Sequence, residues 1–240
     1  MFKKYCLYAF LFWLSSHVSH AQTIAGLTVN IENKEELLSA PVSVNLDNIT
    51  SKIDSSLSLQ FSDNGQWKEI PMQITHGQTR AMHWILSSNQ KKSNATLKYR
   101  LVDKHPGTFN LIKSTDNDGI HTIEFDNKKL LSYYYRTLYP PEGVDSSFKR
   151  SGFIHPLYSP RGQVLTRIQP PDHYHHYGIW NPWTHVLYKG DTIDFWNLNK
   201  RQGTVRFAKF VSKTDGPVYS QFKACMNMLY LTIICRRKLL

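Results

Sequence analysis

The stretch LSLQFSDNGQWKEIPMQI, residues 57–74, decides the fold class. Apolar and polar residues alternate over residues 57–61, and Ser62, Asp63, Asn64 and Gly65 then supply four turn-forming residues. A second apolar-rich run follows over residues 67–74. Because successive side chains of a strand point to opposite faces, this pattern predicts a strand, a turn and a second strand.

The same alternation recurs on both sides of this stretch. It predicts further short strands over residues 27–31, 42–46, 82–86 and 95–102. A polar loop is expected over residues 87–94, and a helical turn over residues 34–38. About six short strands with regular turn signals predict a small antiparallel β-sandwich domain over residues 22–106.

A second unit is expected over residues 107–224. Its predicted strands are residues 122–125, 130–135, 164–168, 192–196 and 204–210. Helical periodicity is poor, so the predicted fold class is all-β, an antiparallel β-sandwich preceded by the smaller one. Residues 225–240 form an atypical C-terminal tail that lacks turn residues and contains Cys225 and Cys235, which could pair in an oxidising compartment. We weighed a final strand with a basic end against an off-frame ending that truncates the second domain, and favoured truncation.

The amino terminus predicts export. Lys3 and Lys4 precede the nine-residue apolar run CLYAFLFWL, and Ser19 and Ala21 occupy the −3 and −1 positions of a cleavage site. A membrane-spanning helix needs about 20 apolar residues, so this run is too short to span. We therefore expect residues 1–21 to be a cleaved signal peptide rather than an uncleaved anchor, and the protein to be periplasmic or secreted with no transmembrane segment after cleavage.

The net charge of +11 is of the kind found in nucleic-acid-binding proteins. Basic pairs such as Lys91–Lys92, Lys128–Lys129 and Lys149–Arg150 are scattered, and each lies in polar, turn-like sequence. No basic stripe with interleaved aromatic residues is present. A solvated basic surface is the preferred interpretation, and no nucleic-acid partner is expected.

Chemistry-bearing residues concentrate in residues 150–197. Five of the eleven histidines lie between His155 and His185, among tryptophan, tyrosine, proline and glycine. On an extended segment, His173 and His175 would point to one face and Asp172 and His176 to the other.

The His173–His175 pair is spaced to hold one divalent metal ion, the only cofactor that the sequence suggests. The third ligand is open among Asp172, His185, His155 and His121. Alternatively, Asp172, His173, His175 and His176 are the candidate catalytic residues of a general acid–base site. Exposed histidines that only fix a loop are the structural alternative.

Aromatic and polar residues accompany these histidines. Flat apolar rings beside hydrogen-bonding groups suit a sugar, which has apolar CH faces and a hydroxyl rim. Trp196, within a predicted strand, was assigned to the core. The candidate substrate-binding residues are His155, Tyr158, Arg161, Trp180 and Trp183.

Three segments carry a family resemblance: residues 155–162 (HPLYSPRG), 170–180 (PPDHYHHYGIW) and 194–197 (DFWN). The pattern resembles an exported bacterial family of unknown function labelled "methane oxygenase PmoA-like". The resemblance implies a β-sandwich, of the large type seen in sugar mutarotases and polysaccharide lyases, in a carbohydrate-utilisation setting. Members continue past the point where this chain ends, and Tyr177 departs from their pattern, so it is assigned no role. The label implies no methane chemistry, because the membrane subunit of that name needs several apolar spans.

These observations predict an exported carbohydrate-active protein with a carbohydrate as its partner. We favour an enzyme, a hydrolase, lyase or epimerase that uses the histidines as acid–base groups or metal ligands. The alternatives are a non-catalytic carbohydrate-binding protein and an oxygen-activating metalloprotein. Paired carboxylates for glycoside hydrolysis are not evident, since Glu124, Glu142 and Asp194 have no distinguishing context.

Overall fold

The computed structural model describes residues 21–31, 39–86, 96–109, 112–181 and 183–231. The predicted signal peptide, the helical turn at 34–38, the loop at 87–94 and the end of the tail from 232 lie outside the described residues, apart from Ala21. Within the described ranges the chain is all-β, as predicted, with only three short 3₁₀ turns: η1 (Asp54–Ser56), η3 (Ser146–Phe148) and η4 (Leu198–Lys200). No helix in these ranges is long and apolar enough to cross a membrane.

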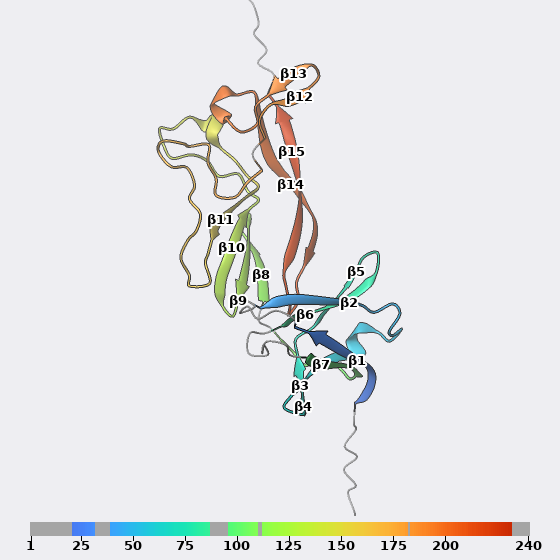
Figure 1. Cartoon of the computed structure of the whole chain (residues 1–240). Coiled ribbons are helices and arrows are strands. Elements are labelled where there is room, and N and C mark those ends of the chain that lie inside the picture. Colours follow the sequence, from blue (N-terminus) through green and yellow to red (C-terminus); the bar gives the residue numbers. More distant parts are fainter. Residues whose placement is uncertain (1–20, 32–38, 87–95, 110–111, 182, 232–240) are drawn as a thin grey trace, which may run out of the picture.

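Two antiparallel sheets form the amino-terminal sandwich (Figure 1). The first sheet has the order β1-β7-β3-β4 and the second the order β2-β6-β5. Their strands are β1 (Gln22–Asn30), β2 (Ala40–Asn45), β3 (Leu57–Asp63), β4 (Gln66–Ile70), β5 (Gln73–His76), β6 (Arg80–Leu86) and β7 (Thr96–Asp103).

The core of this sandwich follows from the alternation of the strands. Leu97, Tyr99 and Leu101 of β7 are buried at every second position, and Met82 and Trp84 of β6 face them. The rings of Trp84 and Tyr99 lie 5.4 Å apart across the two sheets. Burial of these apolar faces, worth about 25 cal/mol per Å² of apolar surface, is what holds the sheets together.

The predicted strand at 67–74 is wrong in one respect, because it is two strands in different sheets. β3 and β4 form a hairpin whose turn residues Asn64 and Gly65 both have positive φ. β4 then ends at Ile70, and Pro71 cannot donate a ladder hydrogen bond. The chain crosses there to the second sheet and continues as β5.

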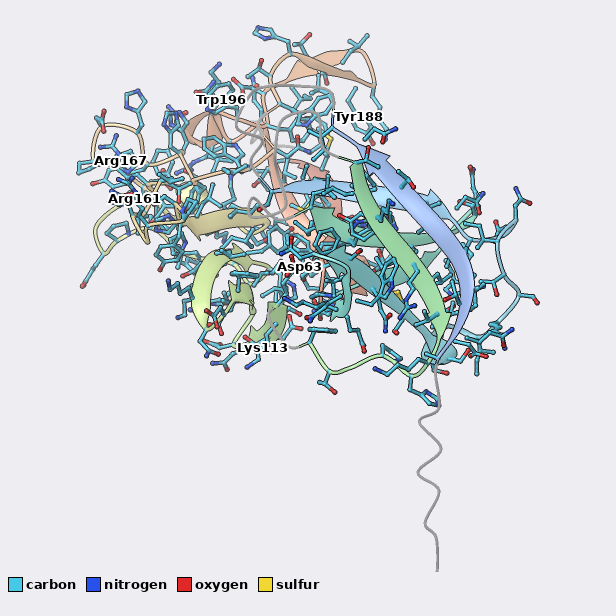
Figure 2. All side chains as sticks on the ribbon, turned by 60° about the horizontal axis from the view of Figure 1, so that its bottom comes forward. Asp63, Lys113, Arg161, Arg167, Tyr188 and Trp196 are labelled. Atoms are coloured by element: carbon cyan, nitrogen blue, oxygen red, sulfur yellow. The ribbon has the colours of Figure 1, made fainter. Side chains whose placement is uncertain are left out.

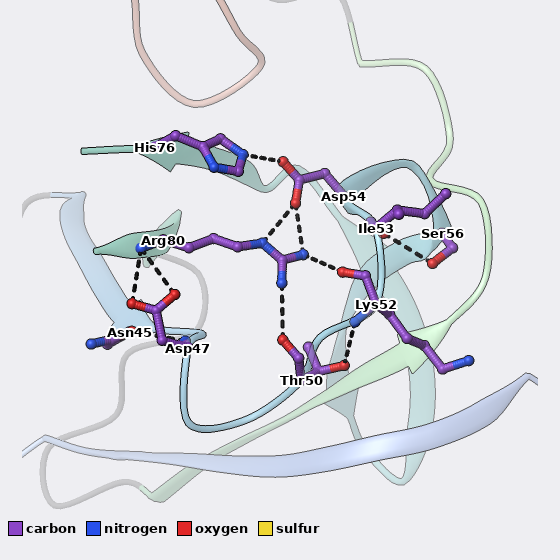
Figure 3. Close-up of polar contacts among 9 residues, drawn as sticks. All are labelled: Asn45, Asp47, Thr50, Lys52, Ile53, Asp54, Ser56, His76 and Arg80. Carbon is purple, nitrogen blue, oxygen red and sulfur yellow. Dashed lines mark hydrogen bonds and ion pairs between the residues drawn. The ribbon is translucent and has the colours of Figure 1, made fainter. Parts of the chain in front are cut away.

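Arg80 clamps the loop that precedes β3 onto the second sheet (Figure 3). Its guanidinium donates to Asp54 Oδ1 at 2.8 Å and to the carbonyls of Thr50 and Lys52 at 2.9 and 2.5 Å. Burial would raise the pKa of Asp54, but hydrogen bonds from His76 and Arg80 outweigh it and lower that pKa. The Arg80 guanidinium bonds to three residues of this one loop, so the role of the network is structural.

The second unit packs a four-stranded sheet against a long hairpin. The sheet has the order β11-β10-β9-β8, and the hairpin joins β14 to β15 (Figure 1). Their bounds, with those of a small hairpin, are β8 (Ile112–Asn117), β9 (Ile120–Phe125), β10 (Lys128–Tyr134), β11 (Phe153–Leu157), β12 (Val186–Tyr188), β13 (Asp191–Ile193), β14 (Gly203–Thr214) and β15 (Gln221–Tyr230).

Aromatic side chains join the sheet to the hairpin. Tyr133 of β10 lies 4.7 Å from Phe222 and 5.9 Å from Phe210 between ring centroids. His121 of β9 is 1% exposed, and its ring packs against the same two phenylalanines. Such offset and edge contacts between rings stabilise the interface beyond their buried area.

The strand predictions for this unit were partly wrong. Residues 164–168 form only isolated bridges, because Val164 pairs with Tyr158 whereas Ile168 pairs with Tyr177. The strand predicted at 192–196 is confined to Asp191–Ile193. Strands β8, β11 and β12 were not predicted, and a final strand in the region of β15 was weighed but not favoured.

The predicted tail begins inside β15. This strand pairs with β14 from Gln221 to Tyr230, so residues 225–230 form regular strand. Cys225 lies exposed in it, and Cys235 falls outside the described residues.

The loop between β14 and β15 contacts the amino-terminal sandwich. Gln73 Oε1 of β5 accepts hydrogen bonds from the backbone of Val218 and Tyr219 at 3.3 and 3.0 Å. The ring of His83 lies 5.6 Å from that of Tyr219. The long hairpin therefore links the two units.

Candidate functional site

The segment over residues 170–180 is a series of turns anchored to β11, and not the extended segment that was predicted. Ile154 of β11 exchanges backbone hydrogen bonds with Ile179, at 2.8 and 3.1 Å. The His173 amide donates to the Pro170 carbonyl, and the His176 amide donates to the His173 carbonyl. Pro170 and Pro171 favour such turns because proline fixes φ and lacks an N–H group.

These turns bring three histidines together instead of placing them on opposite faces. The ring centroids of His175 and His176 lie 4.5 Å apart, and those of His173 and His176 lie 5.0 Å apart. His173 and His175 are 5.6 Å apart. The Asp172 carboxylate lies 2.8 Å from His173 Nδ1. Four predicted catalytic residues therefore form one contiguous group.

Two indoles complete the group. The His176 ring lies 5.4 Å from Trp180 and 6.3 Å from Trp196, and the two indoles meet edge to face at 6.2 Å. The assignment of Trp196 to a core strand was wrong, since it lies half-buried in the turn after β13. We refer to His173, His175, His176, Trp180 and Trp196 as the His–Trp cluster.

Asp194 holds the turn that presents Trp196. One carboxylate oxygen accepts from the amides of Trp196 and Asn197, and the other from Asn197 Nδ2 and Lys200 Nζ, all within 2.7–3.0 Å. Burial would raise the pKa of Asp194, but the hydrogen bonds from Lys200 and Asn197 outweigh it and hold that pKa well below its usual range. Asp194 is thus an ionised structural anchor and not a proton donor.

Arg150 lies beneath the cluster, contrary to the expectation that Lys149–Arg150 belongs to a solvated surface. It is 1% exposed, and its guanidinium carbon lies 5.7 Å from the Trp180 ring centre. Nη2 donates to the Phe195 carbonyl at 3.0 Å, while Nε has no hydrogen-bond partner. Among the described residues, Arg150 forms no ion pair with a carboxylate, so its charge is uncompensated. Burial lowers the pKa of Arg150 to about 10, which leaves it charged at neutral pH.

The surroundings keep two imidazoles neutral. Burial lowers the pKa of His175, and the charges of His176 and His173 lower it further. Arg150 adds to this effect. Burial likewise lowers the pKa of His176, with a further contribution from His173. The hydrogen bond from His173 lowers the pKa of the exposed Asp172 carboxyl. At neutral pH, His175 and His176 are therefore able to accept protons.

The predicted substrate-binding residues are distributed over several places. Trp180 belongs to the His–Trp cluster. Tyr158 and Arg161 line a separate cavity of about 750 Å³. His155 is half-buried on β11, with Nδ1 2.9 Å from Thr166 Oγ1. Trp183 is 50% exposed, and its indole donates to Asn181.

The structure gives the predicted metal pair, His173 and His175, no third ligand among the described residues. No group of three or more His, Cys, Asp or Glu side chains in the described ranges is arranged to hold a metal ion. His121, one of the proposed third ligands, is instead buried against Phe210 and Phe222. The metal prediction therefore rests on His173 and His175 alone, whose ring centroids lie 5.6 Å apart.

Tyr177 has a structural role that the sequence did not indicate. It is fully buried against Phe153, its hydroxyl donates to the Phe148 carbonyl at 2.6 Å, and it accepts from Gln169 Nε2 at 2.6 Å. Burial raises the pKa of Tyr177 to about 12, so the hydroxyl stays protonated. This residue fixes the base of the histidine turns.

The depressed histidine pKa values predict acid sensitivity. The unfolded chain protonates His175 and His176 below about pH 6.5, whereas the folded chain binds these protons only at lower pH. The unfolded state then binds more protons, so the free energy of unfolding falls as the pH drops below about 6.5. Urea unfolding at pH 7.5 and 5.5 should show a smaller loss for a His175→Gln/His176→Gln variant than for the wild type. An equal loss in both proteins would refute the link to these histidines.

Comparison with known proteins finds a family match, and it lies in this region. Residues 121–228 match the model of a family of unknown function, DUF6807. The match spans the His–Trp cluster, Arg150 and most of the β14–β15 hairpin. No curated protein and no solved structure matches the chain.

Proposed function

We propose that the His–Trp cluster is the proton-transfer site of an exported carbohydrate-active enzyme. The observation that carries the proposal is that two neutral imidazoles, His175 and His176, lie in contact with each other, and that His176 also lies beside the Trp180 ring. Neutral imidazoles are effective general bases near neutral pH. The indoles offer the flat apolar surface that a sugar ring needs.

Orientation of a third imidazole supports acid–base chemistry. The Asp172 carboxylate contacts Nδ1 of His173, which fixes the orientation of the ring and leaves its Nε2 facing away from the carboxylate. A base held in one orientation by a third group is a recurrent feature of acid–base and nucleophilic sites.

The carboxylates near the cluster favour proton transfer at carbon over glycoside hydrolysis by paired acids. Asp194 is saturated by structural hydrogen bonds, and Asp172 is committed to His173. Hydrolysis of the usual type needs two free carboxyl groups flanking the glycosidic bond. A neutral imidazole instead suits removal of a proton from a sugar carbon beside a carbonyl or carboxylate group. That step is shared by lyases and epimerases.

In an elimination, an imidazole would take the proton from this carbon. The C–H electron pair would form a carbon–carbon double bond as the glycosidic C–O bond breaks. A protonated imidazole would return a proton to the leaving oxygen. The buried charge of Arg150 would stabilise negative charge that develops on the substrate.

A non-catalytic carbohydrate-binding protein is the second candidate. Trp183 favours it, because half of this indole is exposed close to the cluster in sequence and could serve as a contact surface. The resemblance to exported proteins of carbohydrate utilisation supports both candidates. Export itself rests on residues 1–21.

Incubation of the purified protein with neutral and acidic polysaccharides separates the two functions. Ultraviolet absorbance would detect unsaturated products, and proton NMR in deuterated water would detect exchange at sugar carbons. The proposal predicts one of these two signals for at least one substrate. Saturable binding without either signal would favour the non-catalytic candidate.

A further inference from the structure

One face of the β8–β11 sheet is free of the hairpin and lined with polar groups. His121 and Tyr133 point toward β14 and β15, so their neighbours Thr122 and Ser132 point to the opposite face. The hydroxyls of these two residues lie 3.1 Å apart across the paired strands. This face can therefore offer hydroxyl donors and acceptors to a ligand.

Two adjoining hollows lie along this face. One, of about 750 Å³, lies between the β9–β10 turn and residues 158–162. The other, of about 270 Å³, includes Thr122, Ser132 and Tyr134 in its lining. Lys129 and Tyr158 line both, so the hollows form one continuous surface, which we call the sheet-face groove. The larger volume falls within the range of about 300–1,000 Å³ usual for small-molecule sites.

Both walls of the larger hollow have a defined local conformation. The β9–β10 turn has positive φ at Asp126 and Asn127, as in the two-residue turns that match strand twist. On the other side, Ser159 Oγ lies 2.7 Å from Gln163 Oε1 and accepts from the Gln163 amide at 3.1 Å. A preformed wall lowers the entropy lost on binding.

The larger hollow carries unbalanced positive charge. Lys128, Lys129 and Arg161 line it, with Asp126 as the single acid of the lining. Within the described residues, none of the three cations forms an ion pair with a carboxylate. Figure 2 shows Arg161 on the same side of the molecule as Arg167, whose charge acts on His176. Apolar rings are also present, since Phe125 is 44% exposed beside the cations and Tyr158 lies between the hollows.

We propose that the sheet-face groove binds an acidic oligosaccharide. Its carboxylate or sulfate group would lie between Lys129 and Arg161, and its ring hydroxyls would face Thr122 and Ser132. Cations with free donors recognise such oxyanions, while the Tyr158 ring can cover an apolar sugar face. The choice of a sugar as ligand rests on the proposed function, whereas the choice of an anion rests on the groove itself.

Calorimetric titration of the full chain tests this proposal with a single-stranded oligonucleotide, as a polyanion that is not an oligosaccharide, and with three sugar probes of equal length. These are an oligogalacturonate for carboxylate, a sulfated oligosaccharide for sulfate, and a malto-oligosaccharide as the neutral sugar. We expect one anionic probe to bind, and a Lys129→Gln/Arg161→Gln variant to weaken that binding at least about tenfold. Binding should also weaken as salt rises. A Lys98→Gln/Lys223→Gln variant removes the same charge from exposed positions outside the groove lining and should bind as the wild type does.

Tighter binding of one anionic probe identifies the oxyanion as carboxylate or sulfate. Tighter binding of either one supports the groove as an anion-binding site. Failure of both anionic probes, equal binding by the groove variant, or equally tight binding of the neutral sugar or of a single-stranded oligonucleotide would overturn it. A His175→Ala/His176→Ala variant should lose turnover but keep groove binding, and it thereby distinguishes the two proposals. If the wild type binds at the groove but turns over no polysaccharide, only the proposed enzyme function is refuted. If it turns over a polysaccharide but its binding does not depend on Lys129 and Arg161, only the proposed groove site is refuted.

Discussion

Replacement of His175 and His176 by alanine is expected to lower turnover of the active polysaccharide by at least about 100-fold, the lower end of a general acid–base contribution. Both rings have depressed pKa values because of burial, and both contact neighbours that orient them. Their loss removes the proton acceptors but leaves the anchoring backbone hydrogen bonds of Ile154 and Ile179 in place. Initial rates under subsaturating substrate measure the effect.

His185→Asn is the matched control. His185 is an exposed histidine of the same segment, and asparagine tolerates its φ of +53°. The control should keep the wild-type rate and the wild-type unfolding midpoint. A rate in the His175/His176 variant within a few-fold of wild type, with the fold intact, would remove these residues from the mechanism.

Substitution of Gly178 by alanine is expected to destabilise the protein by about 2–4 kcal/mol, the range of a strained and overpacked site. Gly178 has a φ of +55°, and a Cβ there would lie 2.2 Å from the Ile154 carbonyl oxygen. That oxygen already accepts the hydrogen bond that ties the histidine turns to β11, so it cannot move away freely. The substitution should therefore loosen the His–Trp cluster as well as the fold.

Gly143→Ala separates the clash from the backbone conformation. Gly143 has a φ of +81°, which is also unfavourable for alanine, but nothing lies within 4 Å of the added Cβ. Urea unfolding should show a clearly larger loss of stability for Gly178→Ala than for Gly143→Ala. Equal losses would mean that contact with β11 does not constrain this segment.

The all-β fold could be predicted because period-two alternation depends only on local sequence. The alternation could not show that β4 and β5 belong to different sheets, although Pro71 marks the break. The aromatic contacts between β14 and the sheet could not be predicted either, because they join residues far apart in the chain. The segment beyond Cys225 lacks turn residues, which left a final strand and a truncated ending both open, and the structure shows that its first residues pair as part of β15.

The candidate site was predictable in composition but not in geometry. His173, His175, His176 and Trp180 were identified from their density in sequence, and the structure groups them. Their mutual contacts depend on turns that replace the expected extended segment. Arg150 could not be identified, because a buried arginine beneath Trp180 differs from a surface arginine only in its tertiary contacts.

The most direct test of the central claim is NMR of the histidine imidazoles and tryptophan indoles in the Lys129→Gln/Arg161→Gln variant, with and without a saturating oligosaccharide that this variant binds or turns over. The account predicts chemical-shift changes at His175 and His176, with smaller changes at the Trp180 and Trp196 indoles and none at His105 in the amino-terminal sandwich. Saturable binding that leaves the His175 and His176 resonances unchanged would show that the His–Trp cluster is not the site.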